Sequence, residues 1–141
     1  MKKQECDVQQ VFSVTEDIAR ECYYVMSEYV GNAGVFYEGL PTDVEKRGDV
    51  LFVNMDEFGI NGFIKGQMFD SGAQIEHLYV TKNKHGCGIG SALMQGFLSK
   101  AKKIGIATVR VRARMLPQAL NFYEKHGFVR NGYGCCMTKE L

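Results

Sequence analysis

The run from Lys84 to Gly90 reads KHGCGIG, and its glycines can bring backbone amides within reach of a ligand. Residues 74–80 before it predict a strand, because they are rich in β-branched and aromatic side chains. Residues 89–104 after it predict an amphipathic helix, because apolar residues recur there at steps of three and four. Glycine allows a sharp turn and removes the Cβ atoms that would keep an anion away from the backbone. The unpaired N–H groups at the helix start then favour a phosphate or pyrophosphate.

The spacing of these glycines decides which phosphate ligand is expected. A Walker loop ends in Gly-Lys-Ser/Thr, but Ser91 directly follows Gly90 here. The dinucleotide pattern G-x-G-x-x-G needs glycine at 91 or 93, where the chain has Ser91 and Leu93. The pattern Gln/Arg-x-x-Gly-x-Gly/Ala does fit from His85 to Gly90, except at its first residue. In this loop the chain resembles the GNAT superfamily of acyl-CoA-dependent N-acyltransferases.

A second motif strengthens the resemblance. Residues 119–128 read ALNFYEKHGF and are similar to the late GNAT motif A-x-x-F-Y-e-k-x-G-F. The segment also makes physical sense alone, because Pro117 suits the first turn of a helix and Gly127 suits its left-handed end. Many members carry an asparagine three residues before the alanine, and this chain has Leu116 there. The two motifs occur in the order of the family, and the resemblance covers most of the chain.

The remaining segments alternate between strand and helix patterns. Thr15 is expected to cap the first helix, and residues 56–59 are expected to join two strands as a hairpin. The other elements are strands at 11–14, 50–55, 60–68, 107–113, 128–130 and 135–139, and helices at 16–30, 41–47 and 117–126. This order predicts an α/β (α+β) fold with a mixed central sheet and helices on both faces. The resemblance implies the GNAT fold, in which the 74–80 strand and the next strand splay apart.

The chain has 141 residues, with 45% hydrophobic and 23% charged residues and a net charge of +1. This length predicts a single domain over residues 1–141. The composition argues against a disordered chain and against a nucleic-acid partner, although Arg110, Arg112 and Arg114 alternate along one predicted strand. The 5 cysteines have no zinc spacing, so reduced thiols and no metal are expected. The absence of a signal peptide or long apolar segment predicts a cytoplasmic protein without a membrane partner.

The resemblance implies acetyl-CoA as co-substrate and assigns residues to it. Leu78 and Val80 would offer backbone groups to the pantetheine arm, and Asn121 could bond the cofactor. The predicted pyrophosphate loop consists of His85, Gly86, Cys87, Gly88, Ile89 and Gly90. Lys82 and Lys84 could add positive charge, although such lysines are usually only solvated.

Two residues are candidates for proton transfer. Glu76 lies where several GNAT members carry the glutamate that deprotonates the amine, and its alternative is a salt bridge with Arg110 or Arg112. His77 is a rival base, expected on the opposite strand face together with Ile75 and Tyr79.

Tyr123 resembles the family tyrosine that protonates the leaving thiolate, and its alternative role is core packing. We therefore expect an N-acetyltransferase that moves acetyl from acetyl-CoA to a primary amine by direct attack. The alternative is a catalytically inactive acyl-CoA-binding or regulatory module. Retention of Glu76 and Tyr123 favours the enzyme. We expect a small-molecule or peptide amine as acceptor, while its identity, the acyl chain and a homodimer stay open.

Overall fold

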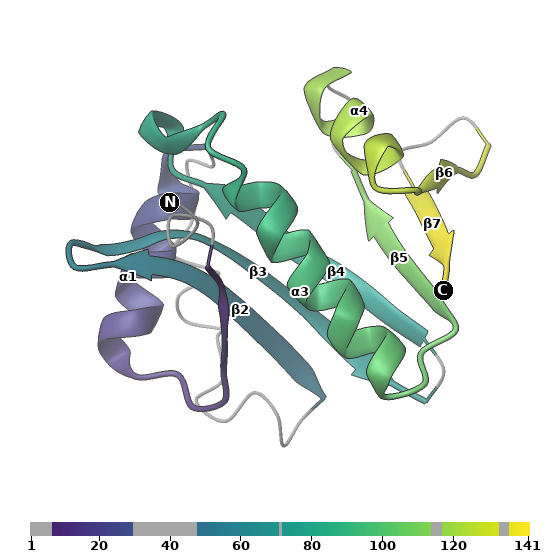
Figure 1. Cartoon of the computed structure of the whole chain (residues 1–141), viewed down its shortest axis with the longest axis horizontal. Coiled ribbons are helices and arrows are strands. Elements are labelled where there is room, and N and C mark those ends of the chain that lie inside the picture. Colours follow the sequence, from purple (N-terminus) through teal and green to yellow (C-terminus); the bar gives the residue numbers. More distant parts are fainter. Residues whose placement is uncertain (1–6, 30–47, 71, 114–116, 133–135) are drawn as a thin grey trace.

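The computed structural model describes residues 7–29, 48–70, 72–113, 117–132 and 136–141, and these form one mixed sheet with helices on both faces (Figure 1). The sheet has seven strands in the order β1-β2-β3-β4-β5-β7-β6. The strands are β1 (Gln9–Val11), β2 (Asp49–Asp56), β3 (Gly59–Phe69), β4 (Gly72–Val80), β5 (Thr108–Arg112), β6 (Val129–Arg130) and β7 (Cys136–Glu140). The helices are α1 (Glu16–Ser27), the 3₁₀ turn η3 (Lys82–Lys84), α3 (Ile89–Lys103) and α4 (Pro117–Lys125). The predicted fold class is confirmed.

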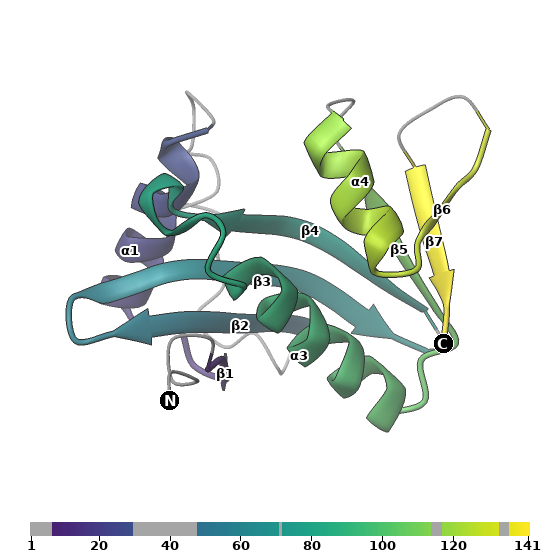
Figure 2. The same cartoon turned by 45° about the horizontal axis from the view of Figure 1, so that its top comes forward.

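Strand β2 is buried on both faces because helices cover the sheet from two sides. Val50 and Phe52 pack into a cluster with α3, which we call the α3-side core. Leu51 and Val53 point the other way into a cluster with α1, the α1-side core. Figures 1 and 2 show α1 and α3 on opposite faces of β2 and β3. Burial on both faces explains why this strand reads as a continuous apolar run rather than an alternation.

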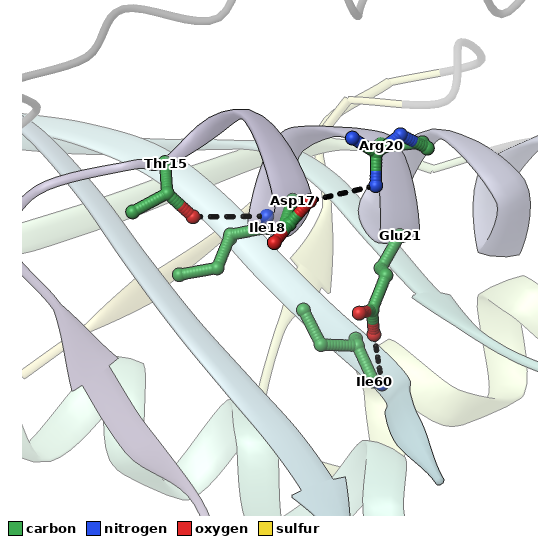
Figure 3. A network of polar contacts seen from close by, with 6 residues as sticks. All are labelled: Thr15, Asp17, Ile18, Arg20, Glu21 and Ile60. Atoms are coloured by element: carbon green, nitrogen blue, oxygen red, sulfur yellow. Dashed lines mark hydrogen bonds and ion pairs between the residues drawn. The ribbon is translucent and has the colours of Figure 1, made fainter.

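Helix α1 is fixed at its start by its cap and along its length by the sheet. The Ile18 N–H donates to the Thr15 hydroxyl at 3.2 Å, so the predicted cap is confirmed. One turn on, the Ile60 N–H of β3 donates to the Glu21 carboxylate at 2.7 Å (Figure 3). Cys22 is fully buried under the helix, and burial raises the pKa of its thiol to about 12. This cysteine therefore serves packing and is unreactive.

The β2–β3 hairpin was predicted correctly, and the N-terminal strand was not. Asp56 pairs with Gly59, and the Phe58 N–H donates to the Asp56 carboxylate at 2.8 Å. The first strand is β1 at Gln9–Val11 instead of 11–14, because the chain must leave the sheet before Thr15 to cap α1. The expected 41–47 helix lies outside the described residues.

The predicted splay of the sheet is confirmed at β4. Its parallel pairing with β5 runs from Gly72 to Ile75 and stops there, although β4 continues to Val80. The β3–β4 register also shifts at this point, because Lys65 pairs with His77 while Gly66 pairs with Ile75. Glu76 is therefore the extra residue of a β-bulge, which re-aims side chains.

The bulge corrects the expected faces of β4. Ile75 belongs to the α3-side core, and Leu78 and Val80 pack against that same core. Tyr79 packs against the α1-side core, and His77 lies beside it with ring centroids 6.2 Å apart. His77 and Tyr79 therefore do not share a face with Ile75, because the inserted residue interrupts the alternation.

Among the described residues, no helix is long and apolar enough to cross a membrane.

Gly66 on β3 gives a test of this packing. A Cβ atom there would overlap the Gln74 carbonyl oxygen and come within 2.8 Å of the Phe97 ring. We expect Gly66→Ala to lower the free energy of unfolding by about 1–3 kcal/mol, the usual cost of overpacking. Urea denaturation measures the change. Gly72→Ala is the matched control, because a Cβ on Gly72 meets nothing within 4 Å. Equal denaturation midpoints for the two variants would contradict this account.

Candidate active site

The loop from β4 to α3 presents the start of α3. Gly86 and Gly88 have φ angles of +85° and +84°, the left-handed region that favours glycine. The Ala92 N–H donates to the Gly88 carbonyl at 3.0 Å as the first bond of the helix. The N–H groups of Ile89, Gly90 and Ser91 precede that bond and are the orphan donors of the helix start. This arrangement suits an anion, and the pyrophosphate assignment of the loop stays a prediction.

The residues directly after α1 bind the beginning of this loop. The Glu28 carboxylate accepts from the Thr81 hydroxyl at 2.7 Å and from the Lys82 N–H at 2.8 Å. These bonds, led by the one from Lys82, lower the pKa of Glu28. The Lys82 ammonium lies 5.1 Å from the centre of the Tyr29 ring. Sequence analysis missed these contacts because they join residues about 50 positions apart, without a local motif.

Tyr29 links α1 to the open edge of β4. Its hydroxyl donates to the Val80 carbonyl at 2.5 Å, and the His85 Nε2 lies 2.5 Å from that hydroxyl. The Thr81 N–H of the same peptide group donates to Asn61 on β3, and a trans peptide directs its carbonyl the opposite way. The Val80 carbonyl therefore lies on the side of β4 that β5 has left. His85, which departs from the family pattern, is directed at Tyr29 and Val80.

Glu76 belongs to a polar cluster on the α1 side of the sheet. The Lys65 ammonium lies 2.5 Å from the Glu76 carboxylate and 3.6 Å from that of Asp49. The Gln67 amide donates to Asp49 at 3.0 Å. The expected alternative partners of Glu76, Arg110 and Arg112, are thus replaced by Lys65. Strand spacing could not show this, because Lys65 reaches Glu76 only through the bulge.

His77 stays in place as the rival base. Burial lowers its pKa, the Lys65 cation lowers it further, and Glu76 opposes both effects. A lowered pKa keeps the imidazole neutral at neutral pH, which is the form that accepts a proton. The structure thus leaves two proton acceptors, a carboxylate and a neutral imidazole, at neighbouring positions of β4.

Helix α4 brings Tyr123 to the other side of β4. The residue is 9% exposed in the α3-side core, and its ring meets Phe122 and Phe128 edge-on at 5.3 Å and 5.6 Å. Burial, with a smaller contribution from Tyr79, raises the pKa of Tyr123 to about 12. The phenol is therefore protonated at neutral pH. Tyr79 is a second phenol near it that sequence analysis did not single out as a proton donor.

Helix α4 also packs on the start of α3. The Phe122 ring lies 3.4 Å from where a Cβ of Gly90 would stand, and the Ser91 hydroxyl lies 3.0 Å from the His126 Nε2. Asn121 is exposed on α4. The structure thus brings the loop, Val80 and α4 together, while Glu76 lies on the opposite face from Tyr123.

A cavity of about 290 Å³ adjoins the loop on the side of the β2–β3 hairpin, away from the splay. It is lined by Asn54, Met55, Asp56, Asn61, Lys84, Cys87 and Ile89. Neither Glu76 nor Tyr123 lines it, so proton transfer by those residues does not belong there. In the described part of the chain, no three His, Cys, Asp or Glu side chains gather as a metal site.

Comparison with known proteins identifies relatives of this arrangement. The family model of the acetyltransferase (GNAT) domain matches residues 15–138. No curated protein sequence matches significantly. Among solved structures, the ribosomal-protein-S18-alanine N-acetyltransferase from Escherichia coli is similar over 96% of this chain and 94% of its own, with 17% identity and a TM-score of 0.75.

Two further structures share the fold. The PaiA N-acetyltransferase from Thermoplasma acidophilum, solved with coenzyme A, has 18% identity and a TM-score of 0.67 over 96% of this chain and 99% of its own. An aminoglycoside 6′-acetyltransferase type Ii has 16% identity and a TM-score of 0.75 over 95% of this chain and 96% of its own. At such identities these structures show the fold alone.

Cys87 reports on occupancy of the loop, because it is exposed between the two left-handed glycines. If the loop holds the cofactor pyrophosphate, acetyl-CoA should slow alkylation of Cys87 by N-ethylmaleimide. At an acetyl-CoA concentration of ten times its Kd, only the small unoccupied fraction of the protein can react, so alkylation should slow about tenfold. Mass spectrometry of labelled peptides measures it. Buried Cys22 should stay unlabelled throughout, as the internal control, and unprotected labelling of Cys87 at saturation would contradict the loop assignment.

Proposed function

Because the chain belongs to the GNAT acetyltransferase family, we propose that it moves the acetyl group of acetyl-CoA to a primary amine by direct attack. The main support for this proposal is three features that follow one another along β4 and the loop after it. The β4–β5 ladder ends at Ile75, the bulge places Glu76 directly after it, and the glycine turn and the start of α3 follow β4. An open strand edge with an anion-binding end and a proton acceptor beside it suits acyl transfer.

The chain's own backbone would hold acetyl-CoA, which supplies the thioester. The N–H groups of Ile89, Gly90 and Ser91 would bind the pyrophosphate, with His85, Gly86, Cys87 and Gly88 forming the turn around it. A Cβ on Gly86 would meet nothing within 4 Å, so space exists on that side of the turn. The open edge of β4 at Leu78 and Val80 would pair with the pantetheine amides. Asn121, exposed on α4, is a further candidate contact.

Glu76 would act as the base that takes a proton from the attacking amine. Its position at the bulge and its bond to Lys65 support this role, because both fix the carboxylate beside the splay. Direct attack needs the neutral amine, so a proton acceptor near the thioester speeds the reaction. The neutral His77 imidazole is the alternative base.

Tyr123 would protonate the departing thiolate. Its pKa of about 12 keeps the phenol protonated over the physiological pH range, so a proton is available for donation. Its contact with Phe122, which packs on Gly90, supports a place close to the cofactor. Tyr79 is the alternative donor, and Tyr133, the other terminal phenol, lies outside the described residues.

The acceptor would be a small-molecule or peptide amine. Solved structures with this fold include an enzyme named for the alanine of a ribosomal protein and one named for aminoglycosides. The function is tested by release of CoA thiol from acetyl-CoA with a panel of polyamines, aminoglycosides and peptides. Acetyl-CoA binding without thiol release from any amine would point to the inactive binding module.

Glu76→Gln keeps the shape of the side chain and removes its ability to accept a proton. We expect turnover with the best amine of the panel to fall about 10²-fold or more, the usual contribution of a positioned base. The Kd for acetyl-CoA should stay the same. Glu57→Gln, in the exposed hairpin turn, is the matched control. Turnover at the unmodified rate would transfer the role to His77 or water.

Tyr123→Phe keeps the ring and removes the hydroxyl. If the phenol protonates the thiolate, kcat should drop about 10²-fold while the Kd for acetyl-CoA and the Tm change little. The exposed Tyr24→Phe provides the control. Because the pKa of Tyr123 is about 12, its ionisation should not produce a basic limb near neutral pH. A full-rate variant would assign Tyr123 to core packing and make Tyr79 the next residue to replace.

A further inference from the structure

Lys65 is a buried cation that the proposed reaction does not itself use. Its side chain is 9% exposed, and it lies between Asp49 at 5% and Glu76 at 28%. Burying an ammonium group is costly unless ion pairs and hydrogen bonds compensate. Such a buried pair is weak evidence of added stability, because apolar residues often do as well. The buried ion pairs of Lys65 therefore need an explanation other than stability.

The contacts form a chain that ends on Glu76. The Gln67 amide holds Asp49, Asp49 lies beside the Lys65 ammonium, and Lys65 donates to Glu76. Gln67, Asp49 and Lys65 all lie in the regular β2–β3 ladder. There Asp49 pairs with Gln67, and Leu51 pairs with Lys65. Glu76 is the residue that the β3–β4 ladder leaves out of register. A rigid part of the sheet thus holds the side chain at the bulge.

We propose that Lys65 is a positioning residue that holds the Glu76 carboxylate in one orientation beside the splay. The inference rests on the proposed function, because it matters only if Glu76 is the base. Lys65 itself would touch neither the amine nor the thioester. A bulge allows an unpaired residue several orientations, and an ion pair to a rigid neighbour selects one of them.

Charged and titratable groups face Glu76 from three strands. Lys65 faces it from β3, Asp49 from β2 and His77 from β4 itself. Arg110 and Arg112 of β5 are exposed, and no ion pair joins them to Glu76 among the described residues. One cation against two carboxylates gives the cluster a net negative charge, which attracts an ammonium acceptor.

Lys65→Gln removes the charge and keeps a polar chain of similar length. We expect kcat to fall about tenfold or more while the KM for the amine changes little, because a carboxylate without its ion pair is less often in the productive orientation. The Kd for acetyl-CoA should stay the same. Lys102→Gln, exposed in the last turn of α3, is the matched control. Lys65→Arg keeps the charge and can keep the ion pair, so it should restore most of the lost kcat.

A double-mutant cycle separates positioning from general support of the fold. If Lys65 acts through Glu76, adding Lys65→Gln to Glu76→Gln should cause no further loss of turnover. A merely structural role would lower turnover equally in both backgrounds. An unchanged kcat in Lys65→Gln, or an equal loss in both backgrounds, overturns the proposal. Unimpaired turnover of Glu76→Gln alone would instead remove the proposed base, so the two failures are distinguishable.

Removing one partner of a buried pair can prevent folding. If Lys65→Gln does not fold, Lys65→Met combined with Asp49→Asn removes the cation together with the more buried of its two carboxylate partners. Only the Glu76 carboxylate, whose side chain is 28% exposed, then loses its ion pair. The same loss of kcat is expected, and an unchanged kcat in this folded variant overturns the proposal.

Discussion

The backbone ladder between β4 and β5 ends at Ile75 and Val111, and the arrangement of the site depends on that break. Buried peptide groups need hydrogen-bond partners. Where two strands separate, their backbone groups must therefore bond to other parts of the protein or stay available to a ligand. Part of the edge is satisfied internally, because Tyr29 donates to the Val80 carbonyl. The remaining edge between two helix-covered halves is where an extended ligand with amide groups can take the place of a strand.

The break also separates the two kinds of chemistry that the proposed reaction needs. The bulge turns Glu76 toward the α1 side, where Lys65 and Asp49 make the surroundings polar. Tyr123 lies in the apolar α3-side core, where burial keeps its hydroxyl protonated. Because a carboxylate is a much weaker base than a phenolate, the Tyr123 phenol keeps its proton without needing to be kept apart from Glu76. The two candidate groups of the proposed reaction therefore differ in their surroundings, one polar and one apolar, on opposite faces of β4.

Local patterns predicted what depends on neighbours in the chain. Glycines with positive φ marked the turn before α3, Thr15 marked the start of α1, and apolar spacing marked the helices. The bulge at Glu76 left no such trace, because it arises from the register between β3 and β4. The Lys65 contact and the Tyr29 contact join distant segments and depend on that register and on the docking of α1. The predicted faces of β4 were wrong for the same reason.

The bond between Ser91 and His126 has a mechanical consequence. Helix α4, β5, β6 and β7 form one body and β1–β4 with α3 form another, and Figures 1 and 2 show them set apart along the splay. The four ladder pairs of β4 and β5 and the α3-side core join these two parts. The Ser91–His126 bond and the Phe122 contact add a direct connection between the start of α3 and α4. Moving α4 away from α3 would therefore break this bond and open part of the α3-side core, so the spacing of the two helices is fixed by more than the strand ladder.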